Sequence, residues 1–260
     1  MNVNYLAFAD PAAGGKVALP TFWHLGASEV PSTRLIPDII RKSRDESKGE
    51  HVLFFGSSAG GFAALNYSAQ FPGSGALVMN PRINVLHEPK RAPKYVPVAF
   101  PDAPLAAVIR SLPYNQARIY GKPRGNFVVY LQNRGDATYN RHHYAHFAKA
   151  VRGRTDMHFV MGDWGKGHVV PPREVFENLL MKLVASAPDW ENAVVPLCFA
   201  EEGAEIVEMT PHVDVLSVSE TFTRLGLALQ DTEDPDKIAE AIADAESAIA
   251  KLRSLETPNR

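Results

Sequence analysis

The sequence predicts an α/β protein with a mostly parallel sheet flanked by helices. Short apolar, β-branched or aromatic runs alternate with longer amphipathic segments through residues 1–186, an order typical of parallel strands joined by helices. In addition, 260 residues with 45% hydrophobic and 22% charged residues are enough to form a sizeable core in a globular protein.

The strands and helices follow from the spacing of apolar residues. Six runs predict strands: Val3–Phe8, Val17–Trp23, His51–Phe55, Gly75–Met79, Asn126–Leu131 and Met157–Met161. Four amphipathic segments predict helices: Ser32–Arg44, Ala59–Gln70, Tyr139–Val151 and Pro172–Ser186. The last helix begins at a proline, which is tolerated there because the first helical N–H groups have no partner.

Residues 81–125 interrupt this alternation, because they contain 8 of the 20 prolines and no long amphipathic period. They predict an irregular insertion with one short helix at Leu105–Leu112. An insertion at this place would lie over the carboxyl ends of the strands, where α/β proteins bind ligands. We therefore expect a lid or specificity loop.

The charge pattern divides the chain near Glu201. Residues 1–200 carry 22 Lys+Arg against 15 Asp+Glu, whereas residues 201–260 carry 5 against 14. We therefore expect a catalytic domain at residues 1–188 and an acidic extension at 189–260, with one or two strands within Val194–Phe222.

The extension also contains a helix that opens at Asp234 and has an apolar stripe. The residues of the stripe are Ile238, Ala241, Ile242, Ala245, Ile249 and Leu252. Such a stripe packs against the rest of the chain, against a second copy, or against another protein.

Several classes of protein are excluded or disfavoured. No apolar run approaches the roughly 18 residues of a membrane-spanning helix, and the first residues resemble no secretory signal. Cys198 is the only cysteine, which excludes an internal disulfide and multi-cysteine metal sites. The basic residues form no stripe with aromatic residues, which disfavours nucleic-acid binding. We expect a cytoplasmic protein without cofactors.

The segment Gly56-Ser57-Ser58-Ala59-Gly60 carries the strongest chemical signal. It matches G-x-S-x-G directly after an apolar strand and before a helix, the context of a nucleophilic serine. Ser58 would lie in a sharp, strained turn, and the Ala59 N–H would form half of an oxyanion hole. Ser58 could instead cap the helix, or the glycines could hold phosphate, although the P-loop ending is missing.

A nucleophilic serine needs a histidine base and a carboxylate that orients it. The loops after the two following strands contain Asp136 and His168, which we expect to be acid and base. Asp163 is the rival acid, but it shares a loop with His168. The second oxyanion donor would come from Ala9 or Asp10, after the first strand.

His142 and His146 have the i, i+4 spacing that can hold a metal. Because no third ligand or His-Glu-x-x-His pattern accompanies them, we expect no metal. A solvated helix face or a wall of the site is the preferred interpretation.

The order Ser58, Asp136, His168 resembles the α/β-hydrolase superfamily over residues 3–186. More narrowly, the chain resembles bacterial hydrolase-like proteins linked to capsule and cell-surface polysaccharide biosynthesis. The residues that carry this likeness are Gly56–Gly61, Asn80-Pro81, Gln132-Asn133, Asp136, His142, His146 and Gly167-His168. The chain departs from this likeness in two places. Few strands precede Val52, which predicts either a reduced sheet or a chain that is a fragment, and position 82 is arginine where the narrower group has glutamine.

The resemblance implies an esterase or acyltransferase with Ser58, His168 and Asp136 as its triad. Residues expected to bind substrate are Ser57, Asn80, Arg82, Gln132, His142 and His146. Cations and apolar residues of the insertion favour a polar or anionic acceptor that bears a small, acetyl-like group, with a carbohydrate as the expected acceptor. The alternative is a non-catalytic module of a polysaccharide-assembly complex that keeps the fold for docking.

Overall fold

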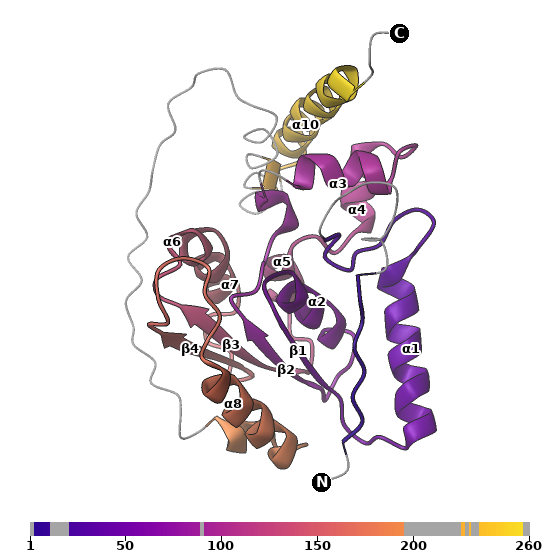
Figure 1. Cartoon of the computed structure of the whole chain (residues 1–260). Helices are drawn as coiled ribbons and strands as arrows, with labels where there is room; N and C mark the ends of the chain where they lie inside the picture. The colour runs from indigo at the N-terminus through magenta and orange to yellow at the C-terminus, as the bar shows by residue number, and fades with distance from the viewer. Residues whose placement is uncertain are drawn as a thin grey trace.

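A computed structural model describes residues 3–10, 21–88, 91–194, 225–226, 229 and 234–256. Its centre is a four-stranded sheet in which the strands lie in the order β1-β2-β3-β4, all parallel (Figure 1). The strands are β1 (Leu53–Ser57), β2 (Gly75–Met79), β3 (Phe127–Asn133) and β4 (Met157–Gly162). The expected α/β class, with a parallel sheet flanked by helices, is confirmed.

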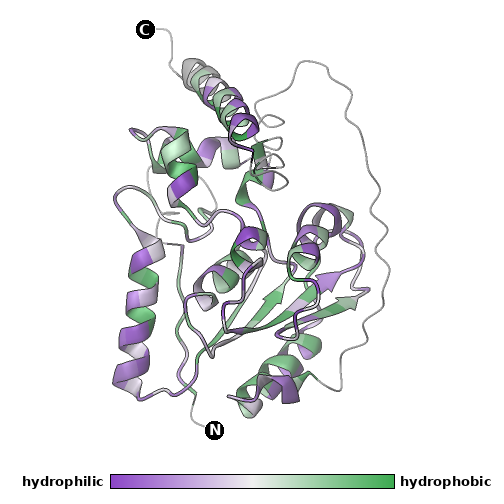
Figure 2. Cartoon of the chain, turned by 180° about the vertical axis from the view of Figure 1, so that it is seen from behind, coloured by the Kyte–Doolittle hydropathy of each residue, from purple (hydrophilic) through white to green (hydrophobic). Residues whose placement is uncertain are grey.

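Helices cover both faces of the sheet, which explains why β2 and β3 are buried along their whole length. One face packs against α2 (Ser58–Ser68), α5 (Gln116–Tyr120) and α7 (Ala145–Ala150). The opposite face packs against α8 (Arg173–Ser186) and the short helix η3 (Trp190–Ala193). Coloured by hydropathy, the central strands form a mostly hydrophobic band (Figure 2).

The N-terminal strand predictions are wrong where the structure describes them. Val3–Phe8 is an extended segment outside the sheet, and the ring of Tyr5 stacks on Phe55 with centroids 6.0 Å apart. Of the run Val17–Trp23, residues 17–20 lie outside the described part, and the rest leads into a turn rather than a strand. Within the described ranges, β1 is therefore the first strand of the sheet along the chain. The helix that precedes it, α1 (Ser32–Ser47), packs against α2.

The insertion contains more helix than its prolines suggest. The expected short helix is present as α4 (Leu105–Ser111), and α3 (Ala92–Ala99), α5 and a 3₁₀ turn, η1 (Val85–His87), accompany it. Pro93 lies in the first turn of α3, where proline is tolerated.

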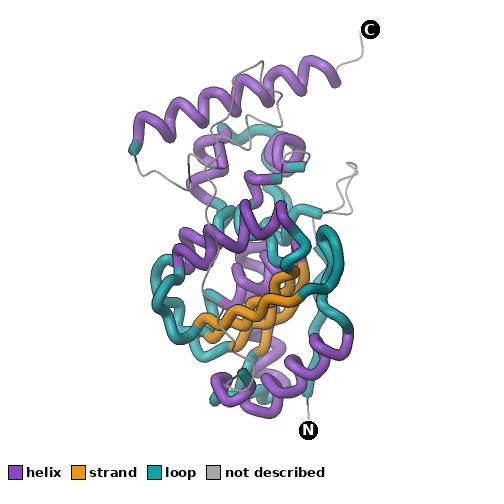
Figure 3. Tube along the Cα trace, turned by 90° about the vertical axis from the view of Figure 1, so that its left-hand side faces the viewer, coloured by secondary structure: helices purple, strands orange, loops and turns teal. Residues whose placement is uncertain are grey.

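The C-terminal helix α10 (Pro235–Glu256) lies over α3 and α4 (Figure 3). Five residues of the expected stripe pack against apolar side chains of α3 and α4: Ile238, Ala241, Ile242, Ala245 and Ile249. The stripe thus packs on the chain itself. The side chain of Leu252 and residues 195–222, with the strands expected there, lie outside the described residues, and the division at residue 188 remains a prediction.

None of the described helices is both long enough and apolar enough to cross a membrane.

Candidate active site

Ser58 lies in the sharp turn that the sequence predicts, between β1 and α2. Its φ of 50° is in the left-handed region, which a serine adopts only under strain. A Cβ on Gly56 would lie 2.5 Å from the carbonyl group of Gly60, so the turn closes only with glycine at position 56. A Cβ on Gly60 would meet open space, whereas one on Gly61 would lie 2.8 Å from Pro81 Cβ. The close packing of α2 against Pro81 therefore requires glycine at position 61 but not at position 60.

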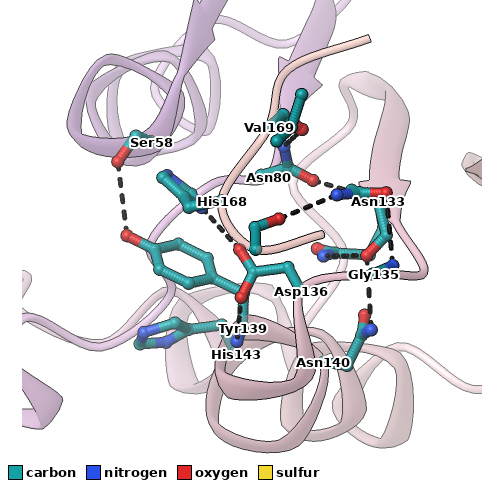
Figure 4. A network of polar contacts seen from close by, with 12 residues as sticks. Ser58, Asn80, Asn133, Gly135, Asp136, Tyr139, Asn140, His143, His168 and Val169 are labelled. Carbon is teal, nitrogen blue, oxygen red and sulfur yellow. Dashed lines mark hydrogen bonds and ion pairs between the residues drawn. The ribbon is translucent and has the colours of Figure 1, made fainter. Parts of the chain in front are cut away.

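The hydroxyl of Ser58 points across the site instead of capping α2. Its Oγ lies 3.2 Å from the phenol oxygen of Tyr139 (Figure 4). The residue that precedes α2 is Ser57, whose side chain makes no capping hydrogen bond. The helix-cap interpretation of Ser58 is therefore wrong.

Asp136 and His168 form a pair at the ends of β3 and β4. His168 Nδ1 lies 2.6 Å from Asp136 Oδ2, and Asp136 Oδ1 accepts a 3.0 Å hydrogen bond from the backbone N–H of Tyr139. The Asp136 side chain is 4% exposed and that of His168 36%. A buried carboxylate thus orients an accessible imidazole, as a general base requires. The rival Asp163 is exposed on the loop after β4.

Two buried asparagines hold together the loops that carry this pair. Asn133 Nδ2 donates 2.8 Å hydrogen bonds to the carbonyls of Gly165 and Gly167, and its Oδ1 accepts from Gly135 and Trp164. A Cβ on Gly135 would collide with the Gly165 carbonyl, so this close approach needs glycine.

Asn80 completes the clamp from the end of β2. It accepts a 2.7 Å hydrogen bond from the Asn133 N–H and donates one of 2.7 Å to the Val169 carbonyl, beside His168. Asn80 and Gln132 are 0% exposed, and their expected role in substrate binding remains a prediction. Both stand at ends of buried strands and face the protein interior.

Arg82 also turns inward. It is 6% exposed and forms a 2.6 Å ion pair with Glu88, while it donates a 2.7 Å hydrogen bond to the phenol oxygen of Tyr139. Its Nη1 lies 3.3 Å from His143 Nε2. The guanidinium of Arg82 is thus connected to Ser58 through Tyr139, and its expected direct contact with substrate remains a prediction.

Tyr139 is the site residue that sequence reasoning missed, because it was assigned only to the start of an expected helix. Its ring lies on the His168 ring with centroids 3.9 Å apart, and its phenol meets Ser58. The available signal was its spacing, since a residue three positions after Asp136 returns to the same side of a helical turn.

Four histidines gather behind Tyr139. The ring of His87 lies 6.0–6.2 Å from the rings of His142, His143 and His146. The helix carrying the last three contains a π-helical turn, η2 (Asn140–Tyr144), between α6 (Ala137–Tyr139) and α7. Across the described ranges, no group of three or more histidine, cysteine or acidic side chains could hold a metal.

Burial lowers the pKa of three of these histidines, His87, His142 and His143. It lowers the pKa of His87 to about 4. Burial, reinforced by the positive charge of Arg82, also holds the pKa of His143 well below its usual range.

The folded protein should lose stability as the pH falls from about 6.5 towards 4, because the unfolded chain then binds a proton at His87 that the folded chain does not. From His87 alone we expect a free energy of unfolding about 2 kcal/mol lower at pH 5 than at pH 7.5. Urea titrations at both pH values measure the difference, which His87→Gln should reduce. His51→Gln, at a partly exposed histidine, is the control, and equal pH dependence in all three proteins would contradict the assignment.

The structure thus brings together Ser58, Asp136 and His168, with Ala59 next in α2. Ser57, His142 and His146 are partly buried near the site or its histidine cluster, and their role in binding remains a prediction. Ala9 is exposed, and no described hydrogen bond links it to Ser58.

Comparisons with known proteins add little to this geometry. No protein-family model matches the chain, and no curated protein matches it significantly. A solved structure reported for carboxylesterases of the ammonia-oxidizing thaumarchaeon Nitrososphaera gargenis superposes with a TM-score of 0.41 at 15% identity. The superposition covers 60% of this chain and 73% of that one. A similarity of this size carries no functional conclusion.

Proposed function

We propose that the protein is a serine hydrolase of the α/β-hydrolase type, which cleaves or transfers a small acyl group carried as an ester. The observation that carries the proposal is the 2.6 Å Asp136–His168 pair beside a serine in a strained turn between strand and helix. Tyr139, which contacts both His168 and Ser58, links the pair to the serine. Serine, acid and base stand at the carboxyl ends of three of the parallel strands, where α/β folds place their sites.

In the first half of the reaction, Ser58 Oγ attacks the ester carbonyl while His168 Nε2 takes its proton. Asp136 holds the Nδ1 hydrogen of His168 and stabilises the imidazolium that forms. The carbonyl oxygen becomes negatively charged and accepts a hydrogen bond from the Ala59 N–H. A second hydrogen bond is expected from the N–H of Ala9 or Asp10. His168 then returns the proton to the departing alcohol, which leaves an acylated serine.

In the second half, water or a sugar hydroxyl attacks the acyl carbon and gives its proton to His168. The bond between the acyl carbon and Ser58 Oγ then breaks, and its electron pair passes to Oγ. His168 returns the proton to the serine. Ser58 Oγ forms its described hydrogen bond with Tyr139 rather than with His168, and such catalytic contacts often tighten only when substrate binds.

The substrate class rests on the resemblance to polysaccharide-linked hydrolases, which favours an acetyl-like group on a carbohydrate. The cationic and apolar residues of the insertion were expected to favour a polar or anionic acceptor, but the structure gives this expectation less support. Arg82 is neutralised by Glu88, and Tyr95 and Val96 are buried within the cluster of α3 and α10. Arg91, which precedes α3, and Lys94 within it are exposed. A small acyl group on a sugar remains the proposal.

A panel of p-nitrophenyl esters from acetyl to octanoyl tests the acyl group. We expect kcat/KM to be highest for acetyl and to fall with chain length, as the proposed acetyl-like substrate requires. Acetylated sugars then serve as substrates, with released and transferred acetate both measured. A preference for octanoyl, or faster cleavage of amides than of esters, would contradict the substrate proposal and leave the triad untouched.

A further inference from the structure

Tyr139 contacts every member of the proposed triad. Its backbone N–H donates to Asp136 Oδ1 at 3.0 Å, its ring lies on the His168 ring, and its phenol oxygen is 3.2 Å from Ser58 Oγ (Figure 4). The residue is only 7% exposed. A group in this position can act on the reacting oxygen itself.

The neighbours of Tyr139 favour one direction for its hydrogen bond to Ser58. Arg82 Nη2 donates to the phenol oxygen at 2.7 Å, and a guanidinium can only donate. Among the described residues, Ser58 Oγ is the hydrogen-bond partner of the phenol that can accept its single hydrogen. We infer that Tyr139 donates this hydrogen to Ser58, which keeps the hydrogen of Ser58 available to His168.

The donor is also held in place. Glu88 fixes the guanidinium of Arg82 with a 2.6 Å ion pair, and Arg82 lies over the Tyr139 ring at 5.1 Å. The stacked His168 ring limits movement on its side. Because the donor is already in position, little free energy is needed to reorient it when negative charge develops on its partner.

We propose that Tyr139 is a catalytic residue that stabilises Ser58 Oγ as a leaving group when the acyl-enzyme is resolved. This inference rests on the proposed serine chemistry. Negative charge grows on Oγ as its bond to the acyl carbon breaks, and the Tyr139 hydrogen bond stabilises that charge until His168 delivers the proton. No proton leaves Tyr139. In acylation the same bond stabilises the deprotonated serine but also weakens its attack, so the two effects largely offset each other.

The test is Tyr139→Phe, which keeps the ring on His168 and the backbone bond to Asp136. With p-nitrophenyl acetate we expect the variant to show a burst of p-nitrophenol release at nearly the wild-type rate. The steady-state kcat that follows should be about 10–100-fold lower than that of the wild type. Intact-protein mass spectrometry should find more acetylated Ser58 in the variant than in the wild type. Tyr114→Phe is the matched control, because its buried phenol also accepts from an arginine, Arg118, away from the site.

The possible outcomes separate this inference from the proposed function. A wild-type burst with unchanged or raised kcat in Tyr139→Phe would overturn the role of Tyr139 and leave the triad standing. The same holds if burst and steady state fall by equal factors, or if Tyr114→Phe behaves alike. A folded wild-type protein that neither hydrolyses the ester nor yields acetylated Ser58 would overturn both proposals. Equal melting temperatures of wild type and Tyr139→Phe show that a lowered kcat is not unfolding.

Discussion

Replacing Ser58 by alanine is expected to lower kcat for ester hydrolysis by on the order of 10⁵–10⁶-fold, because the remaining groups cannot form an acyl-enzyme. The fold should survive, since alanine bears the same Cβ in the same left-handed turn. Steady-state hydrolysis of p-nitrophenyl acetate by both proteins gives the ratio.

The adjacent Ser57 supplies a sharp control. It ends β1 in extended backbone, and its Oγ makes no capping hydrogen bond. Ser57→Ala should keep kcat within about tenfold of wild type, even if Ser57 touches substrate, because it takes no part in the covalent step. Full activity in Ser58→Ala together with inactive Ser57→Ala would show that the wrong serine has been assigned.

Loss of the acid or the base should slow acylation by on the order of 10³–10⁴-fold, since each triad member depends on the others. Asp136→Asn removes the charge that stabilises the imidazolium and favours the wrong tautomer of His168. His168→Asn removes the proton acceptor. Single-turnover acylation measures both.

Asp163→Asn is the control for the acid. Asp163 is exposed on the loop that carries His168, whereas Asp136 is buried against the imidazole. We expect near-wild-type acylation in Asp163→Asn. If instead Asp163→Asn is inactive and Asp136→Asn active, the carboxylate has been misassigned, and equal losses in both would leave Asp136 without a special role.

The sheet was predictable where strands are buried on both faces. Runs such as Gly75–Met79 are apolar throughout and flanked by glycine and polar residues, so the prediction matches β2 from end to end. Val3–Phe8 has a similar composition, but composition does not reveal whether a neighbouring strand is there to pair with. In the insertion, two prolines concealed α3: Pro93 lies in its first turn, where proline is tolerated, and Pro97 lies within the helix.

The pairing of Asp136 with His168 was predictable for a topological reason, since the carboxyl ends of parallel strands gather at one edge of the sheet. Asp136 and His168 follow β3 and β4, and both follow Ser58 in the chain. The spacing of residues does not predict whether a polar side chain at the end of a strand faces the site or the protein interior. Spacing therefore does not reveal that Asn80 and Gln132 are buried, nor that Tyr139 faces Ser58.

The central claim is that Ser58 is an activated nucleophile, and a fluorophosphonate probe tests it most directly, because only an activated serine is labelled rapidly. Folded wild-type protein is incubated with the probe, and the adduct is located by peptide mass spectrometry. The account predicts rapid, stoichiometric labelling of Ser58 and none in Ser58→Ala. A folded wild-type protein that stays unlabelled, or equal labelling of Ser58→Ala, would contradict it and favour a non-catalytic docking module.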